Sequence, residues 1–269
     1  MPKQLPVPNQ RDKSYLLLFE SELIRPDNWD TEKHKAFNKV FTWNDDLIDN
    51  VKYFKMNFSF QVPEKVPKGL SKKEKLCTLI AGNKKVNHSL ELYSKRVEAI
   101  RWFEEYHLDQ FDLYGTGWDS YRFSGPKLIR ALNKIKPLTR LLAPYFPSYR
   151  GKVEQKKAAL EKYKFAICFE NARDIPGYIT EKIFDCFVAG CVPVYWGANN
   201  ITDYVPKACF IDKRDFSSYE DLYCYMTSMS DEEYLSRLNS IQEFLLSPQA
   251  KQFSSESFVE TVLSHVINK

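Results

Sequence analysis

A glutamate and a lysine stand at the expected start of a helix, where a small anion could bind. Glu181 and Lys182 follow Thr180, and the apolar run after them favours a helix that stops at Gly190. Because free N–H groups make a helix N-terminus favour negative charge, Lys182 disfavours the bare helix. A diphosphate between its ammonium group and those N–H groups would remove this conflict, and Glu181 could accept the two hydroxyls of a ribose. The alternative is a solvated Glu/Lys pair on the surface.

A strand–loop–helix–strand pattern must position this pair. The run 164–169 reads as a continuous apolar strand, 170–177 as a loop, 180–189 as a helix and 191–196 as a second strand. This is one βαβ unit, and ligands of open parallel sheets bind beyond the carboxyl ends of the strands, where the loop lies. Pro193 lacks a ladder donor, so we expect its strand at a sheet edge or a bulge.

Shorter apolar runs precede this unit along the chain. A stretch rich in proline and lysine, 63–75, marks the expected domain boundary, whereas 127–157 mixes helix formers, prolines and lysines and predicts no clear order. The remaining predicted elements are strands at 15–19, 39–43, 76–80 and 111–114, an apolar run at 53–60, and a helix at 89–106.

The composition is that of a globular chain with a slight preference for anions. Hydrophobic residues make up 43% of the 269 residues, and the formal net charge is +4. That excess can attract a small phosphorylated ligand, but no nucleic-acid partner is expected from it. No apolar run approaches the roughly 18 residues that span a bilayer, and the first residues lack the apolar segment of a signal peptide. Six cysteines without a CxxC pair predict buried thiols in a reducing compartment.

Metal and adenine-dinucleotide chemistry find no support in the sequence. The four histidines are scattered, and no Asp-x-Asp motif occurs. Asp45 and Asp46 are adjacent, so on a strand they would point to opposite faces, and we interpret them as loop acids. The nine glycines form no GxGxxG motif. We therefore expect no metal ion and no required cofactor.

Three motifs of the βαβ unit occur in an order that is specific when they are taken together. They are Phe169-Glu170-Asn171, the run GYITEKI at 177–183 and the run GCVPVYWGA at 190–198. Together they resemble the family ten glycosyltransferases, the α1,3/α1,4-fucosyltransferases, densely over about 163–216 and more loosely back to about Tyr15. The resemblance implies an α/β, GT-B-like architecture of two Rossmann-like domains facing a cleft. It also implies GDP-fucose as the donor substrate and inversion at the anomeric carbon.

The resemblance further implies which residues bind the donor. Arg96 falls where the family places an arginine on the diphosphate, and a guanidinium can bind two phosphate oxygens at once. The alternative for Arg96 is an arginine on a helix surface. Arg173 is an additional phosphate candidate in the loop after the strand. The residues of the matched motifs that should line the GDP-fucose pocket, with the glutamate on the ribose and the lysine on the phosphates, are Asn171, Tyr178, Glu181 and Lys182.

Inverting transfer needs a carboxylate that removes the proton of the acceptor hydroxyl. The family places this base in a Glu-Ser-Pro-like motif at a strand end, and here Glu20-Ser21-Glu22 follows the first predicted strand. Glu20 is the candidate base. Glu22 stands where the family usually has proline and is the alternative base, because it would face the same way if the strand continued. A solvated acidic loop is the alternative to both.

The expected domains are a partial N-terminal acceptor-side domain, 1–67, and a nucleotide-sugar-binding domain, 68–269, whose last helix is a candidate to pack back on the first. Only nineteen residues precede Glu20, so we expect a shortened N-terminal domain. The predicted location is cytoplasmic, with peripheral membrane contact as an option, and Golgi only if a missing anchor belongs to the native protein.

Two functions follow as hypotheses from these expectations. The first is transfer of L-fucose from GDP-fucose to a glycan hydroxyl, α1,3 or α1,4 on N-acetylglucosamine. The second is a truncated, inactive GDP- or glycan-binding module. The sequence does not determine the acceptor or the oligomeric state.

Overall fold

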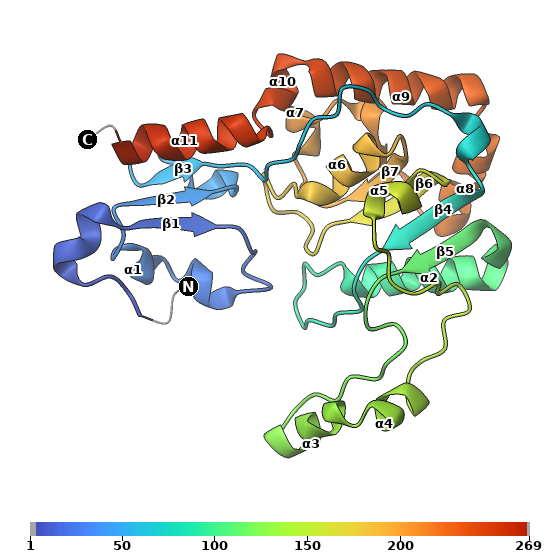
Figure 1. Cartoon of the computed structure of the whole chain (residues 1–269), viewed down its shortest axis with the longest axis horizontal. Coiled ribbons are helices and arrows are strands. Elements are labelled where there is room, and N and C mark those ends of the chain that lie inside the picture. The colour runs from blue at the N-terminus through green and yellow to red at the C-terminus, as the bar shows by residue number, and fades with distance from the viewer. Residues whose placement is uncertain (1–3, 268–269) are drawn as a thin grey trace.

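Two separate parallel sheets organise the chain. The computed structural model describes residues 4–267, and Figure 1 shows a small sheet on the left and a larger one on the right. The small sheet has the order β1-β2-β3, and the large sheet has the order β5-β4-β6-β7-β8. The strands are β1 (Tyr15–Leu18), β2 (Lys39–Thr42), β3 (Tyr53–Lys55), β4 (Lys75–Ile80), β5 (Phe111–Tyr114), β6 (Tyr163–Phe169), β7 (Val192–Trp196) and β8 (Ile211–Asp212).

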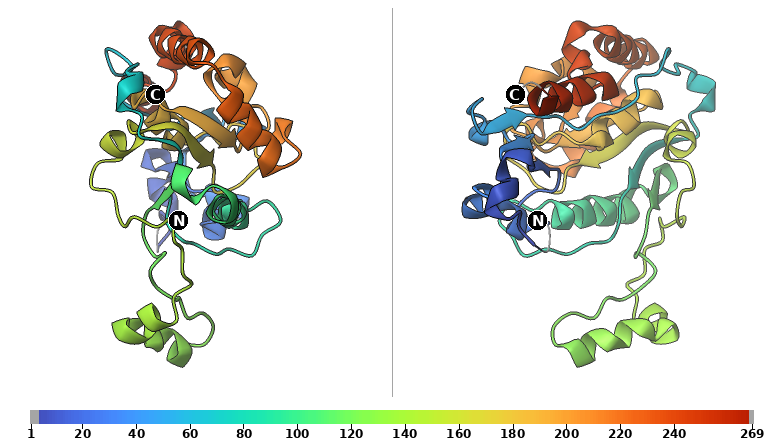
Figure 2. Two further views of the ribbon diagram at one scale, coloured as in Figure 1. Left: turned by 90° about the vertical axis from the view of Figure 1, so that its right-hand side faces the viewer. Right: turned by 60° about the vertical axis from the view of Figure 1, so that its left-hand side comes forward.

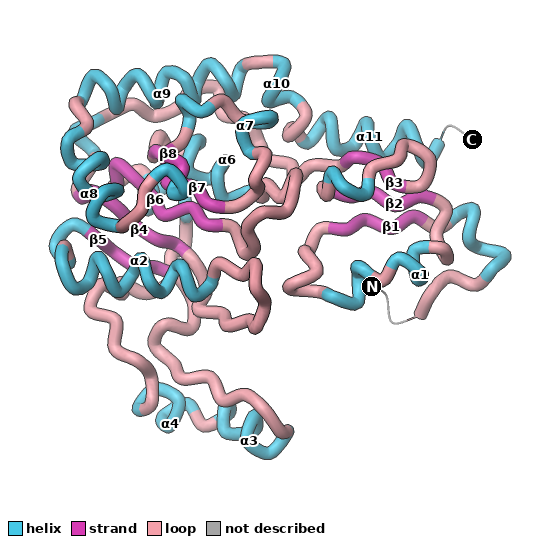
Figure 3. The backbone as a smooth tube through the Cα atoms, turned by 180° about the vertical axis from the view of Figure 1, so that it is seen from behind, coloured by secondary structure: helices cyan, strands magenta, loops and turns pink. Residues whose placement is uncertain are grey.

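Most of the longer helices pack around the large sheet. Helix α2 contacts β5, and α6 contacts β6, β7 and α9. Seen from behind, α2 lies on the β4–β5 side and α9 at the opposite side of this sheet (Figure 3). The helices are α1 (Thr31–His34), α2 (Tyr93–Tyr106), α3 (Lys127–Ala131), α4 (Lys136–Leu141), α5 (Lys156–Leu160), α6 (Glu181–Val188), α7 (Ile201–Tyr204), α8 (Tyr219–Ser228), α9 (Asp231–Leu246), α10 (Pro248–Lys251) and α11 (Ser255–Ile267).

The strand order of the large sheet creates a place for a ligand. Strand β4 lies between β5 and β6: the edge strand β5 pairs with one side of it, and β6, β7 and β8 follow in turn on the other side. The winding therefore reverses between β4 and β6. In sheets of this kind the connections after the two strands diverge and leave a crevice beyond their carboxyl ends. The loop after β6, which carries the predicted donor-binding motif, begins at this crevice.

Burial explains why the sequence pattern predicted the βαβ unit. Six of the seven residues of β6 are buried, so both faces of this strand are covered and its sequence is continuously apolar. Helix α6 buries Ile183, Phe184 and Phe187 on the side facing the sheet. Phe60, from the segment after β3, stacks on Phe184 with ring centroids 3.9 Å apart. The core of the large sheet thus extends into the segment that leads away from the small one.

The expectation for the strand around Pro193 was wrong. Strand β7 is an interior strand, between β6 and β8. Pro193 is opposite Ala166 of β6, but β8 pairs only with Val194 and Tyr195. Because β8 is only two residues long, it ends before it reaches Pro193. The missing N–H group therefore interrupts no ladder on that side, and the proline is tolerated inside the sheet.

The small sheet is covered by the last helix. Lys39 Nζ donates to the carbonyl of His265, 2.9 Å away, and the ring of His265 lies 4.1 Å from that of Phe54. Phe258, on the same helix, stacks on Phe19 with centroids 6.1 Å apart. Figure 1 shows α11 lying along β2 and β3 after the chain has left α10. The domain boundary at 67/68 itself stays a prediction.

The stretch for which the sequence predicted no clear order leaves the body of the protein. Helices α3 and α4 follow one another around a short turn at the end of a projection, which two extended connections carry away from the large sheet (Figures 1 and 2). We call residues 120–147 the lobe.

All six cysteines are free thiols. Five of them are buried, and Cys224 on α8 is exposed. The buried ones lie on or beside β4, β6, α6, β7 and β8.

Candidate active site

A pocket of about 470 Å³ opens at the crevice of the large sheet. It is lined by residues that follow β4, β5 and β6, by the start of α6, and by residues just after β1 of the small sheet. Five cations and two carboxylates line it, so it favours a ligand with several negative charges. The charged residues that line the pocket are Lys84, Arg96, Lys152, Lys156, Lys182, Glu20 and Glu181.

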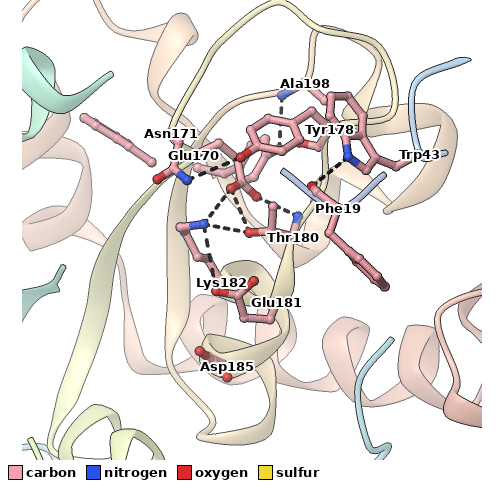
Figure 4. Close-up of polar contacts among 12 residues, drawn as sticks. Phe19, Trp43, Glu170, Asn171, Tyr178, Thr180, Glu181, Lys182, Asp185 and Ala198 are labelled. Atoms are coloured by element: carbon pink, nitrogen blue, oxygen red, sulfur yellow. Dashed lines mark hydrogen bonds and ion pairs between the residues drawn. The ribbon is translucent and has the colours of Figure 1, made fainter. Parts of the chain in front are cut away.

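Lys182 is held at the pocket wall by the loop after β6. Its Nζ donates to Glu170 Oε2 at 3.0 Å and to Thr180 Oγ1 at 2.8 Å (Figure 4). Burial acts to lower the pKa of Lys182, but the neighbouring carboxylates of Glu170 and Glu181 outweigh it and raise that pKa above its ordinary value. The ammonium group therefore stays charged at the pocket, as binding of an anion requires.

Glu170 is the residue that the sequence reasoning missed. Glu170 belongs to the Phe169-Glu170-Asn171 motif, for which the sequence predicted no role of the glutamate. Its side chain is fully buried. Its two carboxylate oxygens accept from Thr180 N and Thr180 Oγ1, both at 2.8 Å, and from Lys182. Because these bonds fix the turn from the loop into α6, Glu170 orients Lys182. A glutamate directly after a continuously apolar strand was the available signal, since a buried carboxylate needs partners.

Arg96 reaches the same loop from α2. Its Nη2 donates to the carbonyls of Phe169 and Glu170 and to Asn171 Oδ1, at 2.6, 2.8 and 3.0 Å. The guanidinium carbon lies 4.9 Å from the ring of Tyr93. Burial lowers the pKa of Arg96, although an arginine remains charged at neutral pH. Arg96 is therefore buried, holds the loop in place through these hydrogen bonds and forms part of the pocket wall. It is not an arginine on a helix surface.

Aromatic contacts join the loop between β6 and α6 to the small sheet. Tyr178 packs against Trp43 with ring centroids 4.5 Å apart, and its hydroxyl accepts from Asn171 Nδ2 at 3.3 Å. Trp43 Nε1 in turn donates to the carbonyl of Phe19 at 2.9 Å (Figure 4). Burial raises the pKa of Tyr178, so its hydroxyl stays protonated. Asn171 and Tyr178 therefore lie at the junction of the two sheets as well as at the pocket.

A glycine permits this close approach. Gly177 has a φ of +76°, and a Cβ there would collide with the carbonyl of Trp43. Its N–H donates to Asn200 Oδ1 at 2.9 Å. The loop between β6 and α6 can touch the small sheet only because this position carries no side chain.

Asp45 makes a second junction between the two sheets. Its carboxylate accepts from Lys55 at 2.5 Å, from Asn200 at 2.9 Å and from Tyr204 at 2.7 Å. Burial acts to raise the pKa of Asp45, but these three hydrogen bonds outweigh it and hold that pKa below its ordinary value. The sequence interpretation of Asp45 as a loop acid missed these partners, of which Asn200 and Tyr204 lie 155 and 159 residues away in the chain.

Glu20 lies directly after the first strand and lines the pocket from the side of the small sheet. Its side chain is exposed, whereas its carbonyl accepts from Trp29 Nε1 at 2.9 Å. Glu22 is exposed and is not among the residues that line the pocket. Arg173 does not line the pocket either. Its guanidinium pairs with Asp174 at 2.7 Å and donates to the carbonyl of Ser89.

Glu181 begins α6 at the mouth of the pocket. Burial acts to raise its pKa, but the neighbouring Lys182 ammonium outweighs it and lowers that pKa, so the carboxylate is ionised at neutral pH.

Six of the eight residues predicted for the site share one pocket, and Glu22 and Arg173 do not. Three further lysines of the pocket were not predicted, because they lie in segments without a recognisable motif: Lys84, Lys152 and Lys156.

The described residues contain neither a metal-binding cluster nor a helix that could cross a membrane. Across 4–267, no group of three or more His, Cys, Asp and Glu side chains is arranged to hold a metal ion. Over the same range no helix combines the length and the apolar character needed to cross a membrane.

Similar structures have the architecture expected from the motifs. A crystal structure of an α1,3-fucosyltransferase with GDP aligns over 100% of this chain and 80% of its own, with a TM-score of 0.54 at 13% identity. A mutant of S. aureus TarM in complex with fondaparinux, α-GlcNAc-glycerol and UDP aligns over 95% of this chain and 50% of its own, with a TM-score of 0.59 at 13% identity. The predicted GT-B-like α/β fold is confirmed by these likenesses.

Sequence comparison identifies the family. An α-(1,3)-fucosyltransferase of Helicobacter pylori is 34% identical over 130 residues, and an α-(1,4)-fucosyltransferase of Arabidopsis thaliana is 38% identical over 74 residues. The matches cover 44% and 28% of this chain but only 26% and 18% of those relatives. Residues 70–244 match the model of glycosyltransferase family 10 (fucosyltransferase), C-terminal part. The resemblance drawn from the three motifs is therefore confirmed, and the chain belongs to glycosyltransferase family 10.

Proposed function

We propose that this protein transfers L-fucose from GDP-fucose to a glycan hydroxyl with inversion at the anomeric carbon. One observation carries the proposal. A single pocket brings Glu20, from the small sheet, to the same space as Arg96 and Lys182, from the large one. A carboxylate facing two cations across a cleft is what base-assisted displacement of a diphosphate requires. Family membership and the solved fucosyltransferases that hold GDP or GDP-fucose support the donor.

The large sheet would bind the donor. Lys182 and Arg96 neutralise the diphosphate, and the free N–H groups at the start of α6 add to this field. Glu181, ionised at the mouth of the pocket, accepts the ribose hydroxyls, and Asn171 and Tyr178 close the wall between donor and small sheet. Since Lys182 is already fixed by Glu170, little reorganisation is needed when negative charge grows on the leaving phosphate.

The small sheet would supply the base. The Glu20 carboxylate takes the proton of the acceptor hydroxyl while the hydroxyl oxygen forms its bond to the anomeric carbon. The bond from that carbon to the phosphate oxygen breaks on the opposite face, and GDP leaves with the electron pair. Glu20 is favoured over Glu22 because only Glu20 lines the pocket.

The names of two relatives support the acceptor class. A mouse relative is named a 4-galactosyl-N-acetylglucosaminide 3-α-L-fucosyltransferase and a bovine one a 3-galactosyl-N-acetylglucosaminide 4-α-L-fucosyltransferase. We therefore propose N-acetylglucosamine in an N-acetyllactosamine-like or lipopolysaccharide glycan as the acceptor sugar. We also propose a reducing, cytoplasmic location, supported by six free cysteines. The prediction of no metal cofactor belongs to the same proposal, because two cations and a helix N-terminus can neutralise a diphosphate.

The test is an assay with GDP-fucose and a panel of glycan acceptors, in the presence of excess chelator. We expect a fucosylated product without added metal, and the anomeric configuration of the product, read by NMR, should be opposite to that of the donor. Loss of activity in chelator with recovery in manganese would contradict the metal-free mechanism. A product that retains the donor configuration would contradict the inverting step.

An inactive GDP- or glycan-binding module is the second candidate. It is favoured by one observation, that the matched segment covers a minor part of the first relatives. Calorimetry with GDP separates the two candidates. Binding of GDP with neither transfer to any acceptor nor hydrolysis of GDP-fucose would establish the module, whereas turnover excludes it.

A further inference from the structure

Packed side chains anchor the lobe where it leaves the body of the protein. Trp118 and Phe146 are buried at its base with ring centroids 5.0 Å apart, and the guanidinium of Arg101 lies 3.8 Å from the ring of Phe146. Within the lobe, Asn133 exchanges two hydrogen bonds of 2.9 Å with the backbone of Phe123. Both views of Figure 2 show α3 and α4 standing clear of the body.

The outer part of the lobe exposes large apolar side chains. Leu128, Leu141 and Tyr145 are 87%, 82% and 81% exposed. Ile129, Ile135 and Leu142 are exposed as well, so both helices and the turn between them contribute. Single exposed leucines are common on proteins, but several gathered on one small projection indicate a surface that is covered in use.

The charge of the lobe identifies what covers it. No Asp or Glu occurs between Asp119 and Glu154, whereas the rest of the chain mixes both signs. The cations therefore have no local carboxylates to neutralise them, and the lobe presents a uniformly positive field. The exposed basic residues of the lobe are Arg122, Lys127, Arg130, Lys134, Lys136 and Arg140.

We propose that the lobe docks the protein on a membrane surface of anionic lipid. Short helices that combine Leu and Ile with Lys and Arg lie in the interface, with apolar side chains among the acyl chains and cations at the headgroups. Basic residues close to an anionic surface each add to the attraction, and these six are accompanied by no acid. A neutral apolar groove of a partner protein would satisfy the leucines and leave the cations without counter-charges.

Docking would also place the candidate active site. The connection that leads out to the lobe supplies Gly115 and Thr116 to the pocket, and the returning connection supplies Lys152, Val153 and Lys156. The pocket is therefore directly behind the base of the lobe. A membrane-bound protein would hold its pocket close to glycans that are carried by lipids at the same surface. The docking proposal itself does not depend on the proposed function.

The experiment is sedimentation of the full chain with vesicles. Phosphatidylcholine vesicles are compared with vesicles of phosphatidylcholine and phosphatidylglycerol, and the partition coefficient is measured at low and high salt. One double variant, Leu128→Ser with Leu141→Ser, removes apolar contacts, and another, Lys127→Gln with Lys134→Gln, removes charges. Matched controls outside the lobe are Leu246→Ser, at an exposed leucine, and Lys65→Gln with Lys251→Gln, at exposed lysines.

We expect the wild-type protein to bind the anionic vesicles and not the neutral ones. Each lobe double variant should bind at least about tenfold more weakly, and the controls should bind as the wild type does. The charge variant should lose the salt-sensitive part of the binding, and the apolar variant the part that survives salt. Circular dichroism and thermal unfolding establish that the variants are folded.

Three results would overturn the proposal. The first is a wild-type protein that does not bind the anionic vesicles. The second is lobe variants that bind as well as the controls, which would move the contact to another surface. The third is a dimer in solution that Leu128→Ser with Leu141→Ser converts to a monomer without vesicle binding by either form, which would make a second copy of this chain the occupant.

Discussion

The two walls of the pocket are built in different ways. On the wall formed by the large sheet, which we propose binds the donor, a fully buried Glu170 holds Thr180 and Lys182, and a buried Arg96 holds the backbone before them. The wall formed by the small sheet, which we propose faces the acceptor, contributes Glu20, whose side chain is exposed. The proposed donor wall is therefore ordered by contacts within the protein before any ligand binds, whereas the proposed base on the other wall has no such network among the described residues.

This difference separates stability from chemistry. Changes on the donor wall leave buried polar groups without partners, so they should affect folding as well as binding. Changes at Glu20 should affect the reaction alone, because its carboxylate is free of the folding network. The four predictions below test this separation, from the largest expected change in free energy to the smallest.

Replacing Glu20 should have the largest effect. We expect Glu20→Gln to reduce transfer by about 10²–10⁴, the usual range for loss of a general base, with unchanged GDP binding and unchanged thermal stability. Steady-state kinetics, calorimetry with GDP and thermal unfolding measure the three quantities. Glu22→Gln is the matched control and should be nearly fully active. Reversed phenotypes would transfer the role of base to Glu22, and two active variants would place the base elsewhere.

Lys182→Ala should come next and should behave differently. We expect kcat/KM to fall about 10²–10³-fold, because its contact with the leaving phosphate strengthens as the bond breaks. The melting temperature should fall too, since the buried carboxylate of Glu170 loses its only ion-pair partner among the described residues. Arg173→Ala, outside the pocket, is the control and should change neither quantity. Wild-type kcat/KM in Lys182→Ala would show that the diphosphate binds elsewhere.

The junction at Asp45 should carry a pH-dependent part of the stability. Asp45→Asn is expected to lower the free energy of unfolding by about 2 kcal/mol at neutral pH, the scale of hydrogen bonds to a charged group. The pKa of Asp45 is lowered in the folded protein, so its contribution is present above the unfolded pKa of about 3.9 and is lost as pH falls through the folded value.

Urea unfolding between pH 3 and pH 7 measures this difference. The gap between wild type and Asp45→Asn should be constant from about pH 5 upward and should close toward pH 3. The exposed neighbour Asp46 provides the control, because Asp46→Asn should leave the curve unchanged. A gap that widens on acidification would contradict the assignment of the junction to an ionised Asp45.

The smallest effect is expected at Glu181. A ribose contact is made equally in the ground state and in the transition state, so Glu181→Gln should raise the KM for the donor by about tenfold or less and leave kcat unchanged. Initial rates over a range of donor concentrations separate the two constants. A fall in kcat at constant KM would move Glu181 into the chemistry and would weaken the division of labour between the walls.

The central part of the fold was predictable because its elements are buried on both sides. In β6 and α6 the apolar pattern follows from coverage by neighbours in the same unit, and the predicted bounds differ from the observed ones by one residue. For α2 the helix was predicted from 89 and begins at Tyr93, because the preceding residues pair with the loop after β6. Contacts of that kind are invisible to local periodicity.

The site was predictable as far as motifs reach. The motifs name residues on separate segments, and only the fold shows that Glu20 and Lys182 share a pocket. The roles of these residues remain proposals. Asp45, Lys84 and the exposed lobe could not be found, because their significance depends on partners or neighbours distant in the chain. Pro193 illustrates the converse error, since a sound local rule failed on the length of a neighbouring strand.

The positions of the thiols allow alkylation to measure how often the large sheet opens. Only Cys224 is accessible in the folded chain, and the nearby Glu220 carboxylate raises the pKa of its thiol, so an alkylating reagent should modify one site and do so slowly. The other five cysteines become reactive only when the large sheet opens. Mass spectrometry of a labelling time course would therefore report the opening of the large sheet alone, because the small sheet contains no cysteine.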